Sequence, residues 1–147
     1  MIKYKVLILF FVIPLSVLSQ AKKDFFKDLT AKEKNVIVNK GTEYPNTGKY
    51  NKHFEKGTYH CKACDSPLYK SNSKFESNCG WPSFDDEIKN AITRHPDYKL
   101  GYKRVEICCA KCGGHLGHVF EGENFTDKNV RHCVNSISLI FKPEKKN

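Results

Sequence analysis

Residues 61–64 read Cys-Lys-Ala-Cys, and residues 109–112 read Cys-Ala-Lys-Cys. Four thiolates in two such turns can close a tetrahedral zinc site, and Gly113 after the second turn lets backbone amides face the sulfurs. The pattern predicts a structural zinc that joins two hairpin tips lying far apart in the chain. The predicted ligands are Cys61, Cys64, Cys109 and Cys112. The alternatives for this spacing are two local disulfides, which the short loop would strain, or a redox-active dithiol.

Short apolar or β-branched segments separated by turns follow Gly57, and they predict a mainly antiparallel β domain. The segments expected as strands are residues 58–60, 67–69, 91–94, 102–107, 116–120, 130–134 and 137–141. Before them, Thr30 and Glu33 have the spacing of a capping box. We therefore expect a brief helix through about Val38, with Gly41 as its stop.

The beginning of the chain has the pattern of a secretory signal. Two lysines precede the apolar run Val6–Leu18, which is shorter than the roughly 20 residues of a comfortable membrane span. We expect cleavage near Ser19–Gln20, so that residues 1–19 are a signal peptide and residues 20–147 form a single domain. The mature protein is then exported, as a periplasmic or secreted protein without stable membrane insertion. The alternative is an uncleaved N-terminal segment that tethers the domain to a membrane.

The chain is basic, with a formal net charge of +9 over 147 residues. Removal of the two lysines in the signal segment lowers this charge to +7. Much of the remaining excess lies near the two ends, in residues 22–34 and 142–146, and so brackets the cysteine motifs. A solvated surface explains this distribution better than a nucleic-acid site does. We therefore expect no nucleic-acid partner, and we expect a monomer.

Three cysteines remain once the zinc ligands are assigned, and Cys133 has the most telling surroundings. It lies in the predicted strand 130–134, where alternate side chains share a face, so Arg131 and Asn135 lie on its face. A cation two residues from a thiol favours the thiolate and lowers its pKa. Asn135 can donate a hydrogen bond to whatever the sulfur attacks. Cys133 is thus a candidate nucleophile, and a buried structural cysteine is the alternative.

Two histidines, His115 and His118, follow the second cysteine pair closely. Four cysteines already fill a tetrahedral site, so the imidazoles are not needed as metal ligands. They are candidates for giving and taking protons near neutral pH. Ordinary hydrogen-bonded histidines are the alternative.

Cys79 begins the segment Cys-Gly-Trp-Pro-Ser-Phe, residues 79–84. Its Trp81 is the only tryptophan of the chain, and a Gly-Trp-Pro turn is an awkward place for a core residue. An indole displayed there can pack against an apolar group such as a methyl, with a core position as the alternative. Cys79 can reach a second thiol if the loops converge. Cys108 has no comparable setting and is interpreted as a bystander.

Taken together, these segments resemble the B-type methionine sulfoxide reductases, which reduce the R epimer of methionine sulfoxide. The resemblance covers roughly Leu29 to Phe141. Its blocks are Gly41-Thr42-Glu43 with Pro45, residues 59–64, 74–77, 79–84, 104–107, 115–120 and 131–136, and Ser138-Leu139. So many blocks in order are far more specific than one short motif. Three positions depart from the family: His132 replaces a usual Tyr or Phe, Asn46 a common aromatic, and Tyr102 a frequent Met.

The resemblance implies both a fold and a reaction. The family fold is a pair of antiparallel sheets, here with a short helical N-terminus and the four-cysteine structural zinc. Cys133 corresponds to the nucleophile, which becomes a sulfenic acid as it reduces the sulfoxide. Cys79 corresponds to the resolving thiol, giving a Cys79–Cys133 disulfide that a thioredoxin-like donor reduces. The implied enzyme repairs oxidative damage, with protein-bound oxidised methionine as the expected substrate.

The same match assigns the remaining site residues. Trp81 matches the residue that packs on the S-methyl group of the substrate. His115, His118 and Asn135 match the groups that bind the sulfoxide oxygen and protonate it. Arg131 lies beside the nucleophile in the last matched block. Cys108 remains an alternative to Cys79 as the resolving thiol.

Composition and spacing alone, without the resemblance, indicate only a zinc-stabilised thiol protein. Two other classes fit that description. One is a secreted zinc-ribbon module that binds an acidic partner through its positive charge, and it predicts three inert thiols. The other is a structural domain stapled by disulfides, which predicts neither zinc nor a free thiol.

Overall fold

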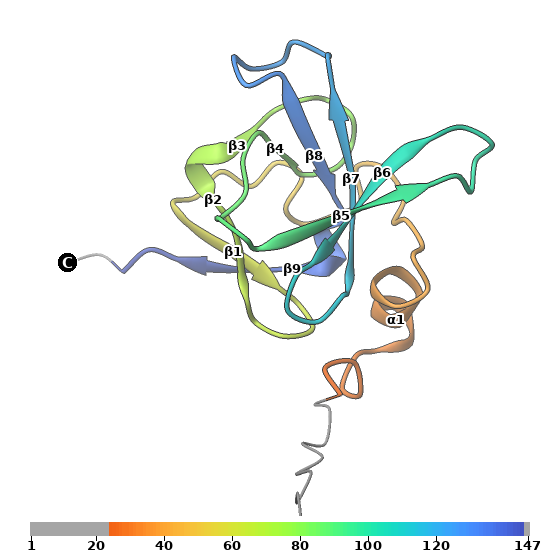
Figure 1. Cartoon of the computed structure of the whole chain (residues 1–147). Helices are drawn as coiled ribbons and strands as arrows, with labels where there is room; N and C mark the ends of the chain where they lie inside the picture. The colour runs from red at the N-terminus through yellow and green to blue at the C-terminus, as the bar shows by residue number, and fades with distance from the viewer. Residues whose placement is uncertain (1–23, 146–147) are drawn as a thin grey trace, which may run out of the picture.

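The computed structural model describes residues 24–145. Its strands form two antiparallel sheets, with the orders β2-β1-β9 and β3-β4-β8-β7-β6-β5 (Figure 1). The three-stranded sheet contains β1 (Gly57–Cys61), β2 (Pro67–Lys70) and β9 (Leu139–Pro143). The six-stranded sheet contains β3 (Lys74–Phe75), β4 (Ser83–Phe84), β5 (Ile92–Asp97), β6 (Arg104–Cys109), β7 (His115–Glu121) and β8 (Val130–Val134). The helical segments are α1 (Ala31–Ile37) and the 3-10 turns η1 (Ser71–Ser73) and η2 (Ser136–Ser138).

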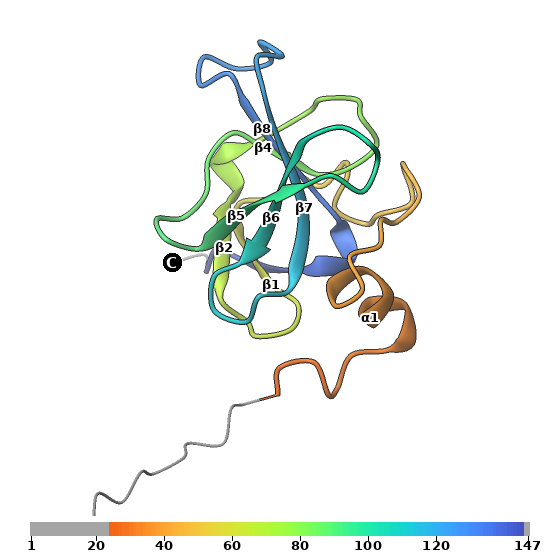
Figure 2. The same cartoon turned by 45° about the vertical axis from the view of Figure 1, so that its right-hand side comes forward.

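Both sheets bring together segments that are far apart in the sequence. Strand β1 pairs with β9 along its whole length, from Gly57 opposite Pro143 to Cys61 opposite Leu139. In the larger sheet, β7 and β8 run side by side (Figure 2), and β8 has β4 as its other neighbour. Strand β8 is therefore hydrogen-bonded on both edges. This pairing fixes its register, and so determines which residues of β4 and β7 lie opposite each of its side chains.

The helix begins at the expected capping box. The hydroxyl of Thr30 accepts a hydrogen bond from Glu33 N at 3.3 Å, and the Glu33 carboxylate accepts one from Thr30 N at 2.8 Å. The end of the helix differs from the expectation, because Lys40, with φ of 58°, takes the left-handed conformation. Gly41 instead donates its N–H to the carbonyl of Asn35 at 3.0 Å. A Cβ at Gly41 would lie 2.8 Å from that carbonyl oxygen, so the glycine permits a close approach of two backbones.

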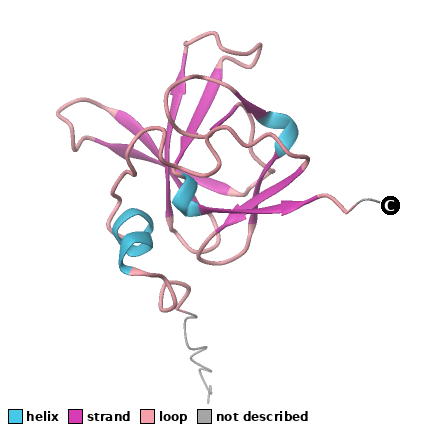
Figure 3. Cartoon of the chain, turned by 180° about the vertical axis from the view of Figure 1, so that it is seen from behind, coloured by secondary structure: helices cyan, strands magenta, loops and turns pink. Residues whose placement is uncertain are grey.

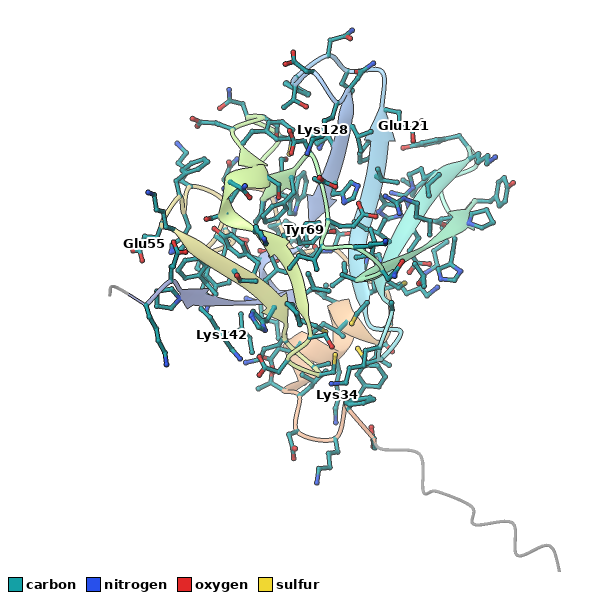
Figure 4. All side chains as sticks on the ribbon, turned by 60° about the vertical axis from the view of Figure 1, so that its left-hand side comes forward. Lys34, Glu55, Tyr69, Glu121, Lys128 and Lys142 are labelled. Atoms are coloured by element: carbon teal, nitrogen blue, oxygen red, sulfur yellow. The ribbon has the colours of Figure 1, made fainter. Side chains whose placement is uncertain are left out.

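The core lies between the two sheets and is rich in aromatic rings. Tyr59 of β1, Tyr69 of β2 and Phe84 of β4 are fully buried. The ring of Tyr69 stacks on Phe84 with centroids 4.3 Å apart, and Tyr59 meets Phe84 edge-on at 5.1 Å. Figure 4 shows Tyr69 inside the molecule and the charged Lys128 and Lys142 at its periphery. Ring contacts between the two sheets thus set how one sheet packs on the other.

The expected mainly β fold with two antiparallel sheets is confirmed, and every segment that was expected to be a strand overlaps an observed strand. Strands β3 and β4 were not expected, because a strand of two residues is too short to produce a periodic pattern. Strands and loops make up most of the described chain, and the helical segments are short (Figure 3). Strand β9 begins at Leu139, since Ser136–Ser138 form a 3-10 turn first. Among residues 24–145, no helix combines the length and the apolar character needed to cross a membrane. The expected signal peptide, residues 1–19, lies outside the described residues.

A histidine, His132 of β8, is completely buried beside this aromatic core. Its Nδ1 lies 3.3 Å from the hydroxyl of Tyr69. Its Nε2 lies 3.6 Å from the Glu87 carboxylate and 3.4 Å from the Arg94 guanidinium. Burial lowers the pKa of His132 to about 4, an effect that Glu87 opposes and Arg94 assists. The folded protein therefore keeps a neutral imidazole at a pH where an unfolded histidine is charged.

We predict that the His132→Phe variant loses less folding stability than the wild type when the pH is lowered from 7 to 4. The unfolded histidine titrates near pH 6.5 and the folded one near pH 4, so the unfolded state binds the extra proton between these values. Stability therefore falls as the pH decreases through this window, and His132 accounts for up to about 3 kcal/mol of the loss at pH 4. Urea unfolding midpoints measured from pH 7 to pH 4 should fall less for the variant.

His95→Phe, at an exposed position of β5, is the matched control for the change in residue type. It leaves His132 in place and should keep the acid-dependent loss of the wild type. Equal losses in the wild type and in His132→Phe would contradict the prediction.

Candidate active site

The four cysteines of the two Cys-x-x-Cys turns meet at one point. Cys61 Sγ lies 3.6 Å from Cys112 Sγ, and Cys64 Sγ lies 3.5 Å from Cys109 Sγ. All four sulfurs lie within 4.8 Å of one another, which places them to hold one metal ion. Sulfur atoms gather at the end of the molecule near the labelled Lys34 (Figure 4). The seven cysteines all belong to the described part of the chain and are free thiols, so a disulfide-stapled domain does not describe this structure.

The two turns reach this point with the same backbone geometry. Asp65 N donates to the carbonyl of Cys61 at 2.9 Å, and Gly113 N donates to the carbonyl of Cys109 at 2.8 Å. Asp65 and Gly113 are also alike in having positive φ angles, of 59° and 75°. One turn leaves the three-stranded sheet at β1, and the other leaves the six-stranded sheet at β6. The cysteine cluster therefore links the two sheets.

Cys133 lies on β8 between two partner strands. It is paired with Ser83 of β4 on one side and with His118 of β7 on the other. Directly opposite residues of antiparallel strands project from the same face, so these three side chains form a row across the sheet. The structure thus brings His118 beside Cys133.

Gly117 permits the close approach of β7 to β8 at this point. A Cβ added to Gly117 would collide with the carbonyl oxygen of Cys133. Any larger residue would push the two strands apart next to the reactive sulfur. The glycine is therefore needed to keep His118 at its place in the row.

A cavity of about 130 Å³ opens over Cys133. The lining residues are Thr42, Trp81, Arg104, Gly117, His118, Phe120, Cys133 and Asn135. Four of these had been assigned to the site from the sequence, and they now share one small space. The other four, Thr42, Arg104, Gly117 and Phe120, were quoted only as parts of longer blocks, without a role. Their contribution depends on tertiary contacts between loops and strands, for which the sequence holds no local signal.

Cys79 Sγ lies 3.8 Å from Cys133 Sγ. A disulfide bond is about 2.05 Å long, so the two sulfurs need to approach by less than about 2 Å to form one. Ser77 Oγ donates a hydrogen bond to Cys79 Sγ at 3.0 Å, and Ser83 Oγ lies 3.5 Å from the same sulfur. Neither serine had been singled out from the sequence.

The two thiols share their protons unequally. Hydrogen bonding with Cys133, and then with Ser77 and Ser83, lowers the pKa of Cys79 to about 4. The contact with Cys79 raises the pKa of Cys133, burial raises it further, and Arg131 acts in the opposite direction. The lowered pKa that the sequence suggested for Cys133 is therefore outweighed in the reduced pair. Together the sulfurs hold one proton and one negative charge.

Trp81 and Asn135 are held by the backbone of one residue, Glu43. The indole Nε1 of Trp81 donates to the carbonyl of Glu43 at 3.0 Å. The amide oxygen of Asn135 accepts from Glu43 N at 3.0 Å, and its Nδ2 donates to the carbonyl of Leu116 at 3.0 Å. Trp81 is only partly buried and lies outside the hydrophobic core, which argues against a core role. The indole and the amide are fixed at the wall of the cavity.

The two histidines have different surroundings. Nε2 of His118 lies 2.8 Å from the Asp97 carboxylate, which Arg104 also contacts at 2.6 Å. The backbone N–H of Lys99, with His118 and Arg104, holds the pKa of Asp97 well below its usual range, so this carboxylate stays charged. His118 is thereby oriented at the edge of the cavity by a permanent negative charge.

His115 lies deeper, and it does not line the cavity. Its Nδ1 is 2.7 Å from the Glu106 carboxylate, which Lys40 also contacts at 2.7 Å. Burial lowers the pKa of His115, while Glu106 opposes this shift. Its ring meets that of His118 edge-on, with centroids 5.6 Å apart. Of the two histidines, His118 is the one placed to touch a bound molecule.

Arg131 lies on β8 and contacts a loop more than it contacts the cavity. Its Nε and Nη2 donate to the two carboxylate oxygens of Glu123 at 2.7 and 2.9 Å. Its guanidinium carbon lies 4.6 Å from the centroid of the Phe120 ring. Its positive charge still favours the thiolate form of Cys133. Arg131 thus acts electrostatically and supports Phe120 at the cavity wall.

Cys108 differs from the other thiols in its surroundings. It lies on β6, two strands away from β8 in the sheet order, whereas Cys79 Sγ is 3.8 Å from Cys133 Sγ. Burial, followed by the nearby Glu106 carboxylate, raises the pKa of Cys108 to about 12. This geometry favours Cys79 over Cys108 as the partner of Cys133.

A family model and several known proteins are similar to most of this chain. A family model described as the SelR domain matches residues 29–143. A chloroplastic peptide methionine sulfoxide reductase B2 from Arabidopsis thaliana is 57% identical over 79% of this chain and 57% of its own length. Peptide methionine sulfoxide reductase 2 from Saccharomyces cerevisiae is 53% identical over 79% of this chain and 73% of its own length. Peptide methionine sulfoxide reductase B5 from Arabidopsis thaliana is 46% identical over 88% of this chain and 92% of its own length.

The coverage and the identity differ among the similar proteins. The chain spans only about half the length of the chloroplastic relatives that it matches. Among solved structures, the Mis18 "Yippee-like" domain is similar with a TM-score of 0.51 and 15% identity, over 63% of this chain and all of that one. Identity this low concerns the fold alone. The SelR match, in contrast, extends from α1 to β9 and includes all seven cysteines, so the chain belongs to the SelR domain family.

Proposed function

We propose that this protein reduces the R epimer of methionine sulfoxide in oxidised proteins to methionine. The observation that carries the proposal is the cavity in which Cys133, His118, Trp81 and Asn135 converge, with the Cys79 sulfur 3.8 Å from that of Cys133. A soft nucleophile, a proton donor, an apolar wall and a second thiol are the parts that this reduction needs. The curated relatives named as peptide methionine sulfoxide reductases support the same conclusion.

In the first step, the Cys133 sulfur attacks the sulfoxide sulfur. The proton shared between the two thiols moves to Cys79, and the charge of Arg131 favours the thiolate that forms at Cys133. His118 protonates the sulfoxide oxygen, which is a poor leaving group without a proton. Oxygen is transferred to Cys133, methionine leaves, and Cys133 becomes a sulfenic acid. The sulfoxide is reduced by two electrons, and Cys133 is oxidised by two.

In the second step, Cys79 attacks the sulfur of the Cys133 sulfenic acid. The S–O bond breaks, the oxygen leaves as water, and a Cys79–Cys133 disulfide forms. A thioredoxin-like dithiol then reduces this disulfide and is itself oxidised. Cysteines carry the electrons throughout the cycle.

The shape of the cavity suggests how one epimer is selected. Trp81 offers an indole surface for the S-methyl group, and Asn135 and His118 offer polar groups for the oxygen. The indole and the amide are hydrogen-bonded to the same residue, Glu43, so their separation is fixed. When the methyl group contacts Trp81 and the oxygen contacts Asn135 and His118, only one epimer of the sulfoxide has its sulfur facing Cys133.

We further propose that the four-cysteine cluster holds a structural zinc ion. Zinc–thiolate bonds of about 2.3 Å in a tetrahedron place the sulfurs about 3.8 Å apart. The separations of 3.6 and 3.5 Å fit this requirement closely. Four sulfur ligands leave no open position for a substrate, so zinc contributes stability and takes no part in the reduction.

We propose that residues 1–19 direct export of the domain to the periplasm or the cell exterior. The apolar run in this segment supports the proposal. Relatives named as chloroplastic show that the SelR domain is found in proteins with targeted destinations. An exported enzyme requires a thioredoxin-like reductant on the same side of the membrane.

We predict that Cys133→Ser abolishes reduction and that Cys79→Ser stops the cycle after one turnover. Without Cys79, the sulfenic acid forms but has no internal thiol to resolve it. The measurement is the amount of methionine formed per enzyme from a peptide containing methionine R-sulfoxide, first without reductant and then with thioredoxin. Expected values are zero for Cys133→Ser, and about one per enzyme for Cys79→Ser under both conditions.

Cys108→Ser is the matched control, because it removes a buried thiol outside the proposed cycle. It should retain continuous turnover with thioredoxin. Turnover by Cys133→Ser, or reduction of the S epimer at an equal rate, would disprove the proposed reaction.

We predict one zinc ion per chain, with stability that depends on it. Cys112→Ser should lose the metal and lower the melting temperature by more than about 10 °C, because metal binding and folding are coupled. Elemental analysis and thermal unfolding measure the two effects. Cys108→Ala, which changes a neighbouring cysteine outside the cluster, should keep a full equivalent of zinc. Full zinc content and unchanged melting in Cys112→Ser would refute the assignment.

A further inference from the structure

We propose that Ser77 and Ser83 form a hydroxyl pair that activates Cys79 as the nucleophile of the disulfide-forming step. The inference rests on the proposed function and adds two residues to the step in which the disulfide forms. Neither serine lines the substrate cavity. Their role therefore concerns the internal thiol and not the sulfoxide.

The two hydroxyls and the sulfur form a continuous chain of hydrogen bonds. Ser83 Oγ lies 2.7 Å from Ser77 Oγ, and Ser77 Oγ lies 3.0 Å from Cys79 Sγ. The backbone N–H of Cys79 also points at the Ser77 oxygen, at 3.4 Å. Ser77 Oγ thus accepts from the backbone of Cys79 and donates its own hydrogen to the sulfur of the same residue. Because Ser77 gives its single hydrogen to the sulfur, the 2.7 Å contact needs the hydrogen of Ser83, for which the Trp81 carbonyl at 3.3 Å is the longer, competing acceptor. Donation by Ser83 to Ser77 strengthens the donation by Ser77 to Cys79.

The fold fixes both serines relative to both sulfurs. Ser83 is buried on β4, directly opposite Cys133 of β8 in the ladder. Ser77 lies at the start of a tight turn, in which Asn78 and Gly80 have φ angles of 56° and 96°. The turn leaves Cys79 Sγ 3.5 Å from Ser83 Oγ of β4. Ser83 is thus anchored next to the target sulfur, and Ser77 is anchored next to the attacking one.

The chemistry of the second step explains why such donors are needed. The Cys79 thiolate attacks the Cys133 sulfur, a sulfur–sulfur bond forms, and the sulfur–oxygen bond breaks with release of hydroxide, which is protonated to water. The low pKa of Cys79, about 4 in the reduced pair, owes its largest contribution to the Cys133 thiol. That thiol no longer exists once Cys133 carries oxygen. Cys79 took up a proton in the first step and must lose it again, and the hydrogen bond from Ser77, backed by Ser83, remains to favour the thiolate at this stage.

The first test measures the ionisation of Cys79 without its thiol partner. In a Cys133→Ala background, the pH dependence of iodoacetamide alkylation at Cys79 is followed by mass spectrometry of the peptide that contains it. Adding Ser77→Ala should raise the midpoint by about one pH unit, the effect expected for a lost charge-assisted hydrogen bond. Ser77→Thr keeps the hydroxyl and should restore the midpoint. An unchanged midpoint in Ser77→Ala overturns the inference.

The second test separates the two steps of the cycle in enzyme that has both thiols. Methionine R-sulfoxide peptide is mixed with enzyme at pH 5 without reductant, and methionine, trapped sulfenic acid and disulfide are quantified over time. Ser77→Ala should give the same methionine burst as the wild type, while the disulfide forms about tenfold more slowly and sulfenic acid accumulates. Disulfide formation at the wild-type rate would overturn the inference and leave the proposed function intact.

Ser73→Ala is the matched control. Ser73 is also largely buried, and its hydroxyl donates to a backbone carbonyl, that of Lys70, at 2.9 Å. The substitution removes one serine hydroxyl bond without touching either sulfur, so both the burst and the disulfide rate should match the wild type. An absent burst in the wild type would instead refute the proposed function, so the two failures are distinguishable.

Discussion

The register of three strands in the larger sheet is the constraint on which the site depends. Pairing of β8 with β4 and β7 places Cys133 between Ser83 and His118. A shift of one residue would turn Cys133 to the opposite face and present His132 or Val134 instead. Gly117 preserves this register by letting the two backbones approach closely. The reactive row is thus a consequence of backbone pairing, and loops add Cys79 and Trp81 to it.

The seven thiols show how surroundings determine what a cysteine does. Four are gathered by matching turns into a cluster that suits a metal ion. Cys108 is buried beside a carboxylate, which raises its pKa to about 12 and makes it unreactive. Cys79 and Cys133 share a proton across 3.8 Å, and hydroxyl donors collect on only one of them. In the proposed cycle, attack on the sulfoxide and formation of the disulfide therefore fall to different sulfurs because their neighbours differ.

Features encoded locally could be predicted from the sequence, whereas those created by tertiary contact could not. The Cys-x-x-Cys turns, the capping box at Thr30 and strand β8 depend on neighbouring residues, and each was predicted at its observed place. Strands β3 and β4 are too short to leave a pattern. The expected lowering of the Cys133 pKa was wrong, because the expectation considered only Arg131, two residues away in the sequence. Cys79, which is 54 residues away, has the larger effect and raises this pKa. Asp97 escaped notice because only the β5–β6–β7 register brings it to His118.

The pairing of β1 with β9 has a consequence for how the protein is made. Strand β1 is synthesised early, but its second partner spans Leu139–Pro143, near the end of the described chain. Until that strand leaves the ribosome, one edge of β1 and the aromatic layer beneath it are uncovered, which invites pairing with other chains. Both cysteine turns precede β9 in the chain, so the proposed zinc ion can link the two sheets before that strand pairs. A chain whose β9 has not yet paired with β1 is therefore the form most open to aggregation.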